Sequence, residues 1–370
     1  MKHAEDNNIL YPLQHGFRSK RSCETQLLEC IDDLTKNMAN GKQTDLLILD
    51  FSKAFDKVGH NLLLHKLNHY GIRGETLEWI RAFLSDRTQV VVVDGQESYI
   101  GNVESGVPQG SVLGPSLFLF YINDLPTNLT STVRLFADDT IVYLTVKSES
   151  DCGELQKDLD KLAIWENKWR MEFHPDKCTV LTVTKKKTPV MFNYKLHGHT
   201  LEHEEATKYL GCTISSDLNW GKHITNICSK ANKTLGFLRR NLHITSKKIK
   251  ERAYKSLVRP QLEYASTVWD PYQQGHIDQI EKVQRRAARY VTGWYRNRSS
   301  VGEMMEHLEW KSMQDRRKES RLAMMYKIVN NKVAIDPEQY FQRPYRTSRN
   351  ATQYHQRPRT TGNGHSSATQ

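Results

Sequence analysis

The sequence predicts a mixed α/β unit in front and an all-helical unit behind. In the front part, short apolar segments of strand length alternate with segments whose apolar residues recur every three or four positions, the spacing of an amphipathic helix. After about residue 220, long amphipathic patterns continue while strand-like segments almost vanish. This change of pattern indicates a domain boundary.

The front unit begins with a helical stripe over residues 21–40 and a short apolar strand over residues 44–51. A hairpin is predicted over residues 87–103, because Asp94-Gly95 supplies the positive φ angles of a tight turn. The other predicted elements are helices around 60–70, 75–85, 114–125 and 154–170, and strands at 133–137, 140–146, 178–184 and 207–215. Strands and helices are therefore mixed throughout the front unit.

The rear part has long amphipathic patterns at residues 222–241, 246–259, 276–292 and 311–331. From about residue 336 the chain is polar, rich in Pro, Arg, Ser, Thr and Gly, and lacks periodicity. Such a segment buries too little apolar surface to offset the entropy lost on ordering. We therefore expect residues 336–370 to be disordered.

Charge is distributed unevenly along the 370 residues. Residues 1–220 hold 24 Lys and Arg against 30 Asp and Glu, whereas residues 221–370 hold 29 against 12. The whole chain has a formal net charge of +11. An acidic front joined to a basic rear indicates a negatively charged partner such as a nucleic acid, although solvated helical faces produce the same balance.

The composition excludes several classes of protein. No apolar run approaches the roughly 20 residues of a membrane span, and residues 1–10 lack the apolar core of a signal peptide. The six cysteines are scattered without a CxxC pair, as in proteins of a reducing compartment. We expect an intracellular protein of the nucleus or cytoplasm that is neither secreted nor bound to a membrane.

Three acidic residues adjoin apolar strands. Asp50 ends the strand of residues 44–51, and Asp138 and Asp139 fill the turn between two later strands. Acids buried near one another are costly unless a cation neutralises them. Two divalent ions about 4 Å apart suit phosphoryl transfer, and hard oxygen ligands favour Mg²⁺. Because a single acid at such a place is more often a turn residue, the inference depends on the surrounding segments.

Several segments, in this order along the chain, resemble the signature blocks of reverse transcriptases. The main blocks are LLILDFSKAFDKV (46–58), SGVPQGSVLGPSLFLFYINDL (105–125) and FADDT (136–140). Further similar blocks are QHGFRSKRSCETQL (14–27), HPDKCTVLTV (174–183) and KYLGCTIS (208–215). The chain resembles in particular the polymerases of non-LTR (LINE-type, jockey/CR1-like) retrotransposons, from about residue 10 to about residue 335.

The resemblance implies a right-hand polymerase fold of the α+β class. Its palm is an antiparallel sheet with packed helices, accompanied by partial fingers and followed by an all-helical thumb. It also implies an N-terminally truncated copy, because the fingers segment that precedes these blocks in the family has no counterpart before Met1. The implied divisions are a residual fingers segment (1–45), a palm with a fingers-associated insert (46–218), a basic helical thumb with a C-terminal helical region (219–335) and the disordered tail (336–370).

The resemblance assigns catalytic roles to four residues. Asp50 and Asp138 match the family's metal-binding aspartates, and Asp139 matches the second acid of the paired motif. Together these three residues imply two Mg²⁺ ions. Lys177 falls where the family carries a lysine that protonates the departing pyrophosphate, and a solvated surface lysine is the alternative interpretation.

Three further residues match the family's substrate pocket. Phe55 stands five positions after Asp50, where an aromatic ring beneath the sugar would clash with a 2′-hydroxyl and so select deoxynucleotides. Gln109 and Gly110 match the block that lines the template and nucleotide pocket, where a glycine lets the backbone approach closely. The structural alternative for Phe55 is core packing. For Gln109 and Gly110 it is an ordinary turn after Pro108.

Basic residues crowd two successive helical patterns, at Lys230, Lys233, Arg239, Arg240, Lys247 and Lys248. A thumb that holds a primer–template duplex contacts backbone phosphates and needs such a face. The clusters at 285–289 and 316–318 would extend this face, and Arg18 would lie near the template or the triphosphate. For the two clusters and for Arg18, the alternative interpretation is a set of ordinary solvated surface residues.

The implied activity is that of an RNA-directed DNA polymerase, which transfers nucleotides onto a primer 3′-hydroxyl by a two-metal mechanism. Its partners would be an RNA template, a DNA primer and deoxynucleoside triphosphates. The alternative is a catalytically inactive truncated remnant that at most binds nucleic acid. A group II intron maturase is a rival within the enzyme class, but no maturase-like or HNH-type His/Asn block follows the helical thumb.

Overall fold

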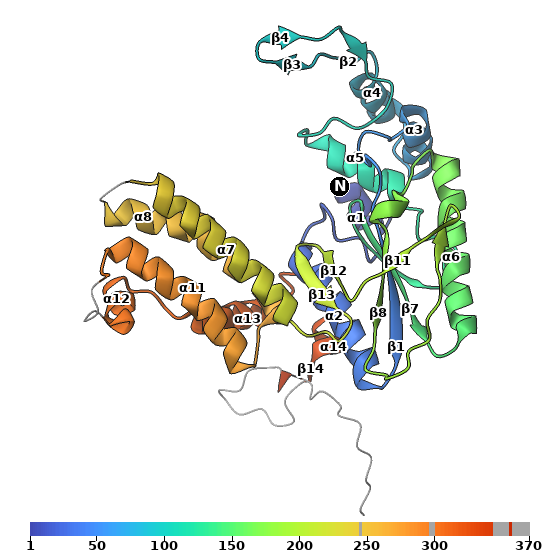
Figure 1. Cartoon of the computed structure of the whole chain (residues 1–370). Coiled ribbons are helices and arrows are strands. Elements are labelled where there is room, and N and C mark those ends of the chain that lie inside the picture. The colour runs from blue at the N-terminus through green and yellow to red at the C-terminus, as the bar shows by residue number, and fades with distance from the viewer. Residues whose placement is uncertain (244–245, 296–299, 343–354, 357–370) are drawn as a thin grey trace, which may run out of the picture. The chain divides into compact units, whose positions relative to one another are not determined.

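The structure is a computed structural model, and it describes residues 1–243, 246–295, 300–342 and 355–356 (Figure 1). It divides into two compact units. The first unit comprises residues 1–26 and 36–205, and the second comprises residues 27–35 and the chain from Ala206 onward. Within the described ranges, no helix has both the length and the apolar character needed to cross a membrane.

A five-stranded sheet forms the centre of the first unit, in the order β11-β8-β1-β7-β6. Neighbouring strands are antiparallel, except that β11 runs parallel to β8. β1 lies in the middle and is almost wholly buried, because its apolar run faces neighbours on both sides. The strands are β1 (Gln43–Leu49), β6 (Thr132–Phe136), β7 (Asp139–Val146), β8 (Thr179–Val183) and β11 (Glu202–His203).

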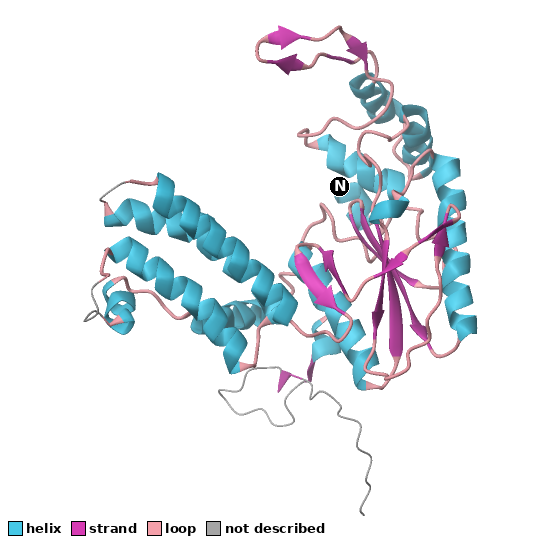
Figure 2. Cartoon of the chain, in the orientation of Figure 1, coloured by secondary structure: helices cyan, strands magenta, loops and turns pink. Residues whose placement is uncertain are grey.

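Helices accompany this sheet in the first unit (Figure 2). α5 is apolar on all sides, and its residues 117–122 are buried, so it is a core helix rather than an amphipathic one. α6 packs its Leu155, Leu159 and Leu162 into the same core. The predicted α+β fold is thus confirmed. The helices are α1 (Lys2–Asp6), α3 (His60–His69), α4 (Gly74–Leu84), α5 (Leu113–Ile122), α6 (Glu149–Trp169) and the 3₁₀ turn η1 (Pro175–Lys177). A further helix, α2 (Cys23–Ala39), is divided between the units, because its residues 27–35 belong to the second.

Two hairpins complete the first unit. In the first, Asp94 and Gly95 have φ angles of 51° and 79°, which confirms the predicted turn. In the second, His197 and Gly198 form an equivalent turn between β9 and β10. The strands concerned are β2 (Thr88–Gln89), β3 (Val92–Val93), β4 (Gln96–Glu97), β5 (Gly101–Asn102), β9 (Lys195–Leu196) and β10 (His199–Thr200).

The second unit opens with a hairpin of β12 (Ala206–Tyr209) and β13 (Cys212–Ser215). The prediction of one strand over 207–215 is therefore wrong. Leu210 and Gly211 adopt positive φ angles of 44° and 82°, and this turn reverses the chain. Because the Tyr264 hydroxyl donates to the Leu210 carbonyl at 3.0 Å, the hairpin is tied to the helices that follow it.

The rest of the second unit is mainly helical, as predicted. The pattern at 246–259 is divided by a π-helical turn, a feature that helical periodicity alone does not reveal. The elements are α7 (Gly221–Asn241), α8 (Lys247–Ala253), the π turn η2 (Tyr254–Val258), α9 (Arg259–Glu263), α10 (Ser266–Trp269), α11 (Gln274–Thr292), α12 (Val301–His307), α13 (Met313–Val329), α14 (Pro337–Tyr340), β14 (Phe341–Gln342) and β15 (His355–Gln356).

The beginning of the predicted disordered tail has a defined structure. The Asp336 carboxylate accepts the Glu338 N–H at 3.0 Å and caps α14. Phe341 is buried in a cluster with Met324 and Ile328. The prediction of disorder is therefore wrong for residues 336–342, where an N-cap begins α14 and both Tyr340 and Phe341 pack on this cluster. Apart from β15, the remainder of the predicted tail lies outside the described residues.

Candidate active site

The sheet brings Asp50 and Asp138 to the same end of neighbouring strands. β1 and β7 are antiparallel, and Leu49 pairs with Thr140. The residue after β1 therefore lies beside the residues that begin β7. Burial raises the pKa of the Asp138 carboxyl above its ordinary value, and the charge of Asp50 raises it further. The two carboxylates are thus close enough to repel each other.

Asp139 is placed differently. It is the first residue of β7 and is exposed, whereas Asp138 is half-buried in the preceding turn. Within the described residues, no three His, Cys, Asp or Glu side chains are gathered in a way that could hold a metal ion. The expected convergence of three acids is therefore not seen in the described residues: Asp138 lies half-buried in the turn, whereas Asp139 is exposed at the start of β7.

The donor set of this pair still suits a hard cation. Both side chains offer carboxylate oxygens. Burial raises the pKa of the Asp138 carboxyl first and the charge of Asp50 raises it further, and a bound cation would offset both effects. Asp50 and Asp138 thus offer the kind of oxygen ligand that a divalent ion prefers.

Lys177 reaches Asp50 from the 3₁₀ turn η1. Its Nζ lies 3.4 Å from Asp50 Oδ2, and more than half of the lysine side chain is exposed. The chain around this turn is tied to the residues after β1, since His174 N–H donates to the Asp50 carbonyl at 2.8 Å. Phe51 and Phe173 also stack, with ring centroids 4.1 Å apart. The structure therefore fixes Lys177 beside one of the two acids.

Phe55 is held by other aromatic rings. It stacks on Phe118 of α5 with centroids 4.3 Å apart and meets Phe17 edge-on at 6.4 Å. The ring is only half-buried, so part of it remains exposed to solvent. Core packing and a substrate-facing role are thus compatible for this residue, because one face is packed and the remainder is accessible.

Gln109 and Gly110 lie in an exposed loop before α5. The Gln109 side-chain amide donates to Asp56 Oδ1 at 2.9 Å, which links this loop to the segment that carries Phe55. Gly110 has a φ of 79° and open space around it, so backbone conformation rather than close packing favours glycine. Close approach occurs instead at Gly106, where an added Cβ would lie 2.9 Å from the Asp56 backbone.

The predicted nucleic-acid-binding cations of the second unit are all exposed. They lie on α7 and at the start of α8, two helices that follow one another along the chain (Figure 1). We call this set the basic face; it comprises Lys230, Lys233, Arg239, Arg240, Lys247 and Lys248.

Other basic residues singled out in the sequence have structural partners. Arg18 donates from Nε to the Glu5 carboxylate at 2.9 Å and is largely buried. Arg317 is fully buried and pairs with Asp270 at 2.7 Å. Arg18 and Arg317 are therefore not phosphate-facing groups, because their guanidinium groups are used inside the protein.

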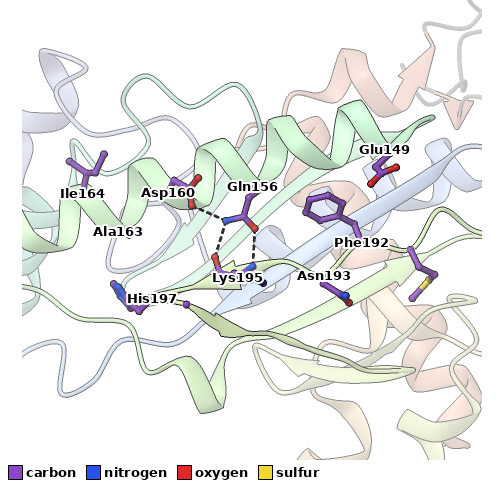
Figure 3. Close-up of a pocket in the computed structure, with 11 residues that line it drawn as sticks. Glu149, Gln156, Asp160, Ala163, Ile164, Phe192, Asn193, Lys195 and His197 are labelled. Carbon is purple, nitrogen blue, oxygen red and sulfur yellow. Dashed lines mark hydrogen bonds between the residues drawn. The ribbon is translucent and has the colours of Figure 1, made fainter.

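The structure also has an open groove along α6, with a volume of about 860 Å³ (Figure 3). Gln156 spans it, donating to the Lys195 carbonyl and accepting the Lys195 N–H, each at 2.8 Å. Its other lining residues come from α6 and the segment 191–198. Since none of the candidate site residues lines this groove, it is separate from the acidic pair.

The fold and the acidic pair agree with the sequence family. The family described as "Reverse transcriptase (RNA-dependent DNA polymerase)" matches residues 1–214, more than half of the chain. The chain therefore belongs to the reverse transcriptase family. Members of this family generally use divalent metal ions.

Curated relatives place the similarity among mobile elements. The chain is 32% identical over 297 residues to the RNA-directed DNA polymerase from mobile element jockey of Drosophila melanogaster, covering 76% of this chain and 32% of the relative. It is 27% identical over 309 residues to the probable RNA-directed DNA polymerase from transposon BS of the same species, with 78% and 33% covered. The predicted resemblance to jockey-like polymerases is confirmed. The chain spans about a third of the length of these relatives.

Solved structures with a similar chain path include two telomerases. Apo telomerase from Candida tropicalis gives a TM-score of 0.47 at 10% identity, covering 91% of this chain and 58% of that chain. Telomerase from Candida albicans in complex with a TWJ fragment of telomeric RNA gives 0.44 at 11% identity, with 83% and 55% covered.

Proposed function

We propose that this chain catalyses RNA-directed DNA synthesis, adding deoxynucleotides to the 3′-hydroxyl of a primer paired with an RNA template. The observation that carries the proposal is the position of Asp50 and Asp138 at one end of the sheet, where burial and then the charge of Asp50 raise the pKa of Asp138. A cation binds favourably between such carboxylates, because it removes their repulsion.

The residues around this pair have distinct proposed roles. Asp50 and Asp138 would hold two Mg²⁺ ions, and Asp139 would supply a further acid at the start of β7. When bound, the metal pair lowers the pKa of the attacking hydroxyl and stabilises the leaving pyrophosphate. Lys177, already beside Asp50, donates a proton to that leaving group.

The substrate-binding roles follow from the exposed groups nearby. The accessible part of the Phe55 ring contacts the sugar of the incoming nucleotide and excludes a 2′-hydroxyl. Gln109 and Gly110 line the nucleotide and template pocket, in a loop joined to the Phe55 segment through Asp56. The basic face binds the phosphates of the primer–template duplex. Because these partners are intracellular, we place the protein in the nucleus or cytoplasm.

The test is primer extension on an RNA template with Mg²⁺ and labelled deoxynucleotides. Asp50→Ala and Asp138→Ala should each reduce extension by roughly 100-fold or more, since each removes a metal ligand. Asp160→Ala is the matched control, because Asp160 is an exposed acid on α6 outside the site. Extension that survives both active-site substitutions would refute the catalytic assignment.

Nucleic-acid binding without catalysis is the second candidate function. It is favoured by the basic face, which belongs to the second unit and includes none of the three acids. Salt-dependent duplex binding by the wild-type chain, without any Mg²⁺-dependent extension, would select this function over polymerisation.

A further inference from the structure

The segment before α2 runs along the outer edge of the sheet and reaches the acidic turn. Gln14 pairs in parallel with Leu135 of β6. His15 N–H donates to the Leu135 carbonyl at 2.8 Å, and Leu135 N–H donates to the Leu13 carbonyl at 3.1 Å. This short pairing places Gln14 next to the end of β6, where the chain turns toward β7.

The Gln14 side chain is buried and bonds to the turn itself. Its Oε1 accepts the N–H of Ala137 at 3.0 Å and the N–H of Gly16 at 2.7 Å. Because both partners are donors, the group facing them must be the side-chain oxygen. Gln14 is only 2% exposed, so water does not compete for either bond.

Ala137 adopts an unusual backbone conformation in this turn. Its φ is 53°, in the left-handed region that residues with a Cβ rarely occupy. A glycine would adopt this conformation easily, but an alanine does not favour it. The surrounding structure must therefore impose it. The bond from Gln14 is the described side-chain contact that holds the Ala137 N–H.

Gly16 permits the close approach on which this bond depends. A Cβ added at Gly16 would lie 2.4 Å from the Ala137 nitrogen and 3.0 Å from the Phe136 carbonyl carbon. Both contacts are with backbone, which cannot move aside as the end of a flexible side chain can. The segment 14–16 is therefore fitted to the turn by a side-chain acceptor and by the absence of a Cβ.

We infer that Gln14 is a positioning residue for Asp138, an inference that rests on the proposed function. Ala137 directly precedes Asp138, and the peptide plane between them leaves few freedoms once Ala137 is fixed. By holding the Ala137 N–H, Gln14 sets the direction in which the Asp138 carboxylate leaves the turn toward Asp50. A site that holds metal ions tolerates little displacement of its ligands, so this support matters for rate.

The main test compares Gln14→Met with wild type in single-nucleotide addition. Methionine has similar length and volume but no oxygen to accept the two N–H groups. The rate at saturating nucleotide and Mg²⁺ should fall about 10- to 100-fold, with nucleotide KM and duplex affinity unchanged. Equal rates in the two proteins would overturn the inference.

Gln14→Glu is the conservative variant. A carboxyl oxygen can accept the same two N–H groups, and Gln14 Nε2 has no hydrogen-bond partner in the described parts of the chain, so its loss breaks no bond there. Gln14→Glu should therefore restore the bond to the Ala137 N–H, and it should recover part of the rate that Gln14→Met loses, since a carboxyl buried near Asp138 carries a cost of its own. If Gln14→Met does not fold, Gln14→Asn replaces it, since its amide oxygen lies one methylene too short to reach Ala137.

Gln43→Met is the matched control for buried glutamines. Gln43 is fully buried at the opposite end of β1 and accepts the Val190 N–H at 2.9 Å. Its loss should lower Tm without lowering the addition rate of the folded protein. A rate loss in Gln43→Met equal to that in Gln14→Met would assign the effect to general destabilisation and overturn the inference.

Hydrogen exchange at single-residue resolution tests the inference without any activity. The Ala137 amide should exchange several-fold faster in Gln14→Met than in wild type, Gln14→Glu or Gln43→Met, because its acceptor is gone. Unchanged Ala137 exchange would overturn the positioning role. If the variants show this exchange pattern but the wild-type chain shows no primer extension, the proposed function is contradicted and the positioning role is not. The two failures are therefore distinguishable.

Discussion

The Lys177 ammonium lies 3.4 Å from the Asp50 carboxylate, so the structure pairs one acid of the candidate site with a cation of its own. Both side chains are about half exposed, and such a pair contributes little to stability. The pairing is instead informative about function, because it keeps a proton donor beside an acid that is proposed to bind metal.

Lys177→Met should slow nucleotide addition while leaving metal binding intact. A general acid typically contributes about 100-fold or more to a rate, whereas removing a competing cation cannot weaken Mg²⁺ binding at Asp50. The expected result is a slower rate at saturating Mg²⁺ with a half-saturating Mg²⁺ concentration no higher than that of wild type. A higher Mg²⁺ requirement at an unchanged rate would contradict the acid role.

Phe55→Ala should weaken discrimination against ribonucleotides. The ring is held by its stacking on Phe118 and its edge-on contact with Phe17, so its removal opens space beneath the sugar. The ratio of kcat/KM for deoxynucleotides over ribonucleotides should fall roughly 10- to 100-fold. Phe192→Ala, which removes a half-buried ring beside the groove, should leave the ratio unchanged. An unaltered ratio in Phe55→Ala would assign this residue to the core alone.

The double variant Lys230→Gln/Lys233→Gln should bind duplex more weakly and with less dependence on salt. Each lysine that contacts a phosphate contributes about one unit to the slope of log affinity against log salt. We expect the slope to become shallower by about one to two units in a titration between low and moderate salt. Lys185→Gln/Lys186→Gln removes the same charge from an exposed loop of the first unit and should leave the slope unchanged.

Glu166→Gln should remove a pH dependence of stability. Burial raises the pKa of Glu166 from 4.5 to about 7, although bonds from Phe173 N–H and His197 oppose the rise. Between these two values the native state binds more protons than the unfolded chain. The free energy of unfolding therefore falls as pH increases across this window, by at most about 1.4 kcal/mol per pH unit from this group.

Urea unfolding of wild type and Glu166→Gln at pH 5 and pH 7.5 measures this contribution. The glutamine keeps an oxygen for the Phe173 N–H but does not titrate, so the variant should gain stability relative to wild type as pH rises. A difference between the two proteins that stays constant with pH would show that Glu166 does not titrate in this range.

Local sequence patterns predicted much of the secondary structure. The apolar run before Asp50 became the buried central strand, and Asp94-Gly95 formed the expected turn, because burial and positive φ are imposed by the residues themselves. Prediction failed over 207–215, where a non-glycine residue, Leu210, takes a positive φ. The prediction that residues 316–318 extend the basic face is also wrong for Arg317. This residue is buried in an ion pair with Asp270, a contact between distant segments that local patterns do not reveal.

The sequence alone determined the order of the elements, the family and the identity of the candidate residues, since these depend on residue types and their spacing. Only the tertiary structure decided which of these residues meet. Antiparallel pairing of β1 and β7 brings Asp50 beside Asp138, whereas Asp139 begins a strand whose residues alternate between its two faces. The support from Gln14 likewise depends on a chain segment more than one hundred residues away, which local patterns cannot specify.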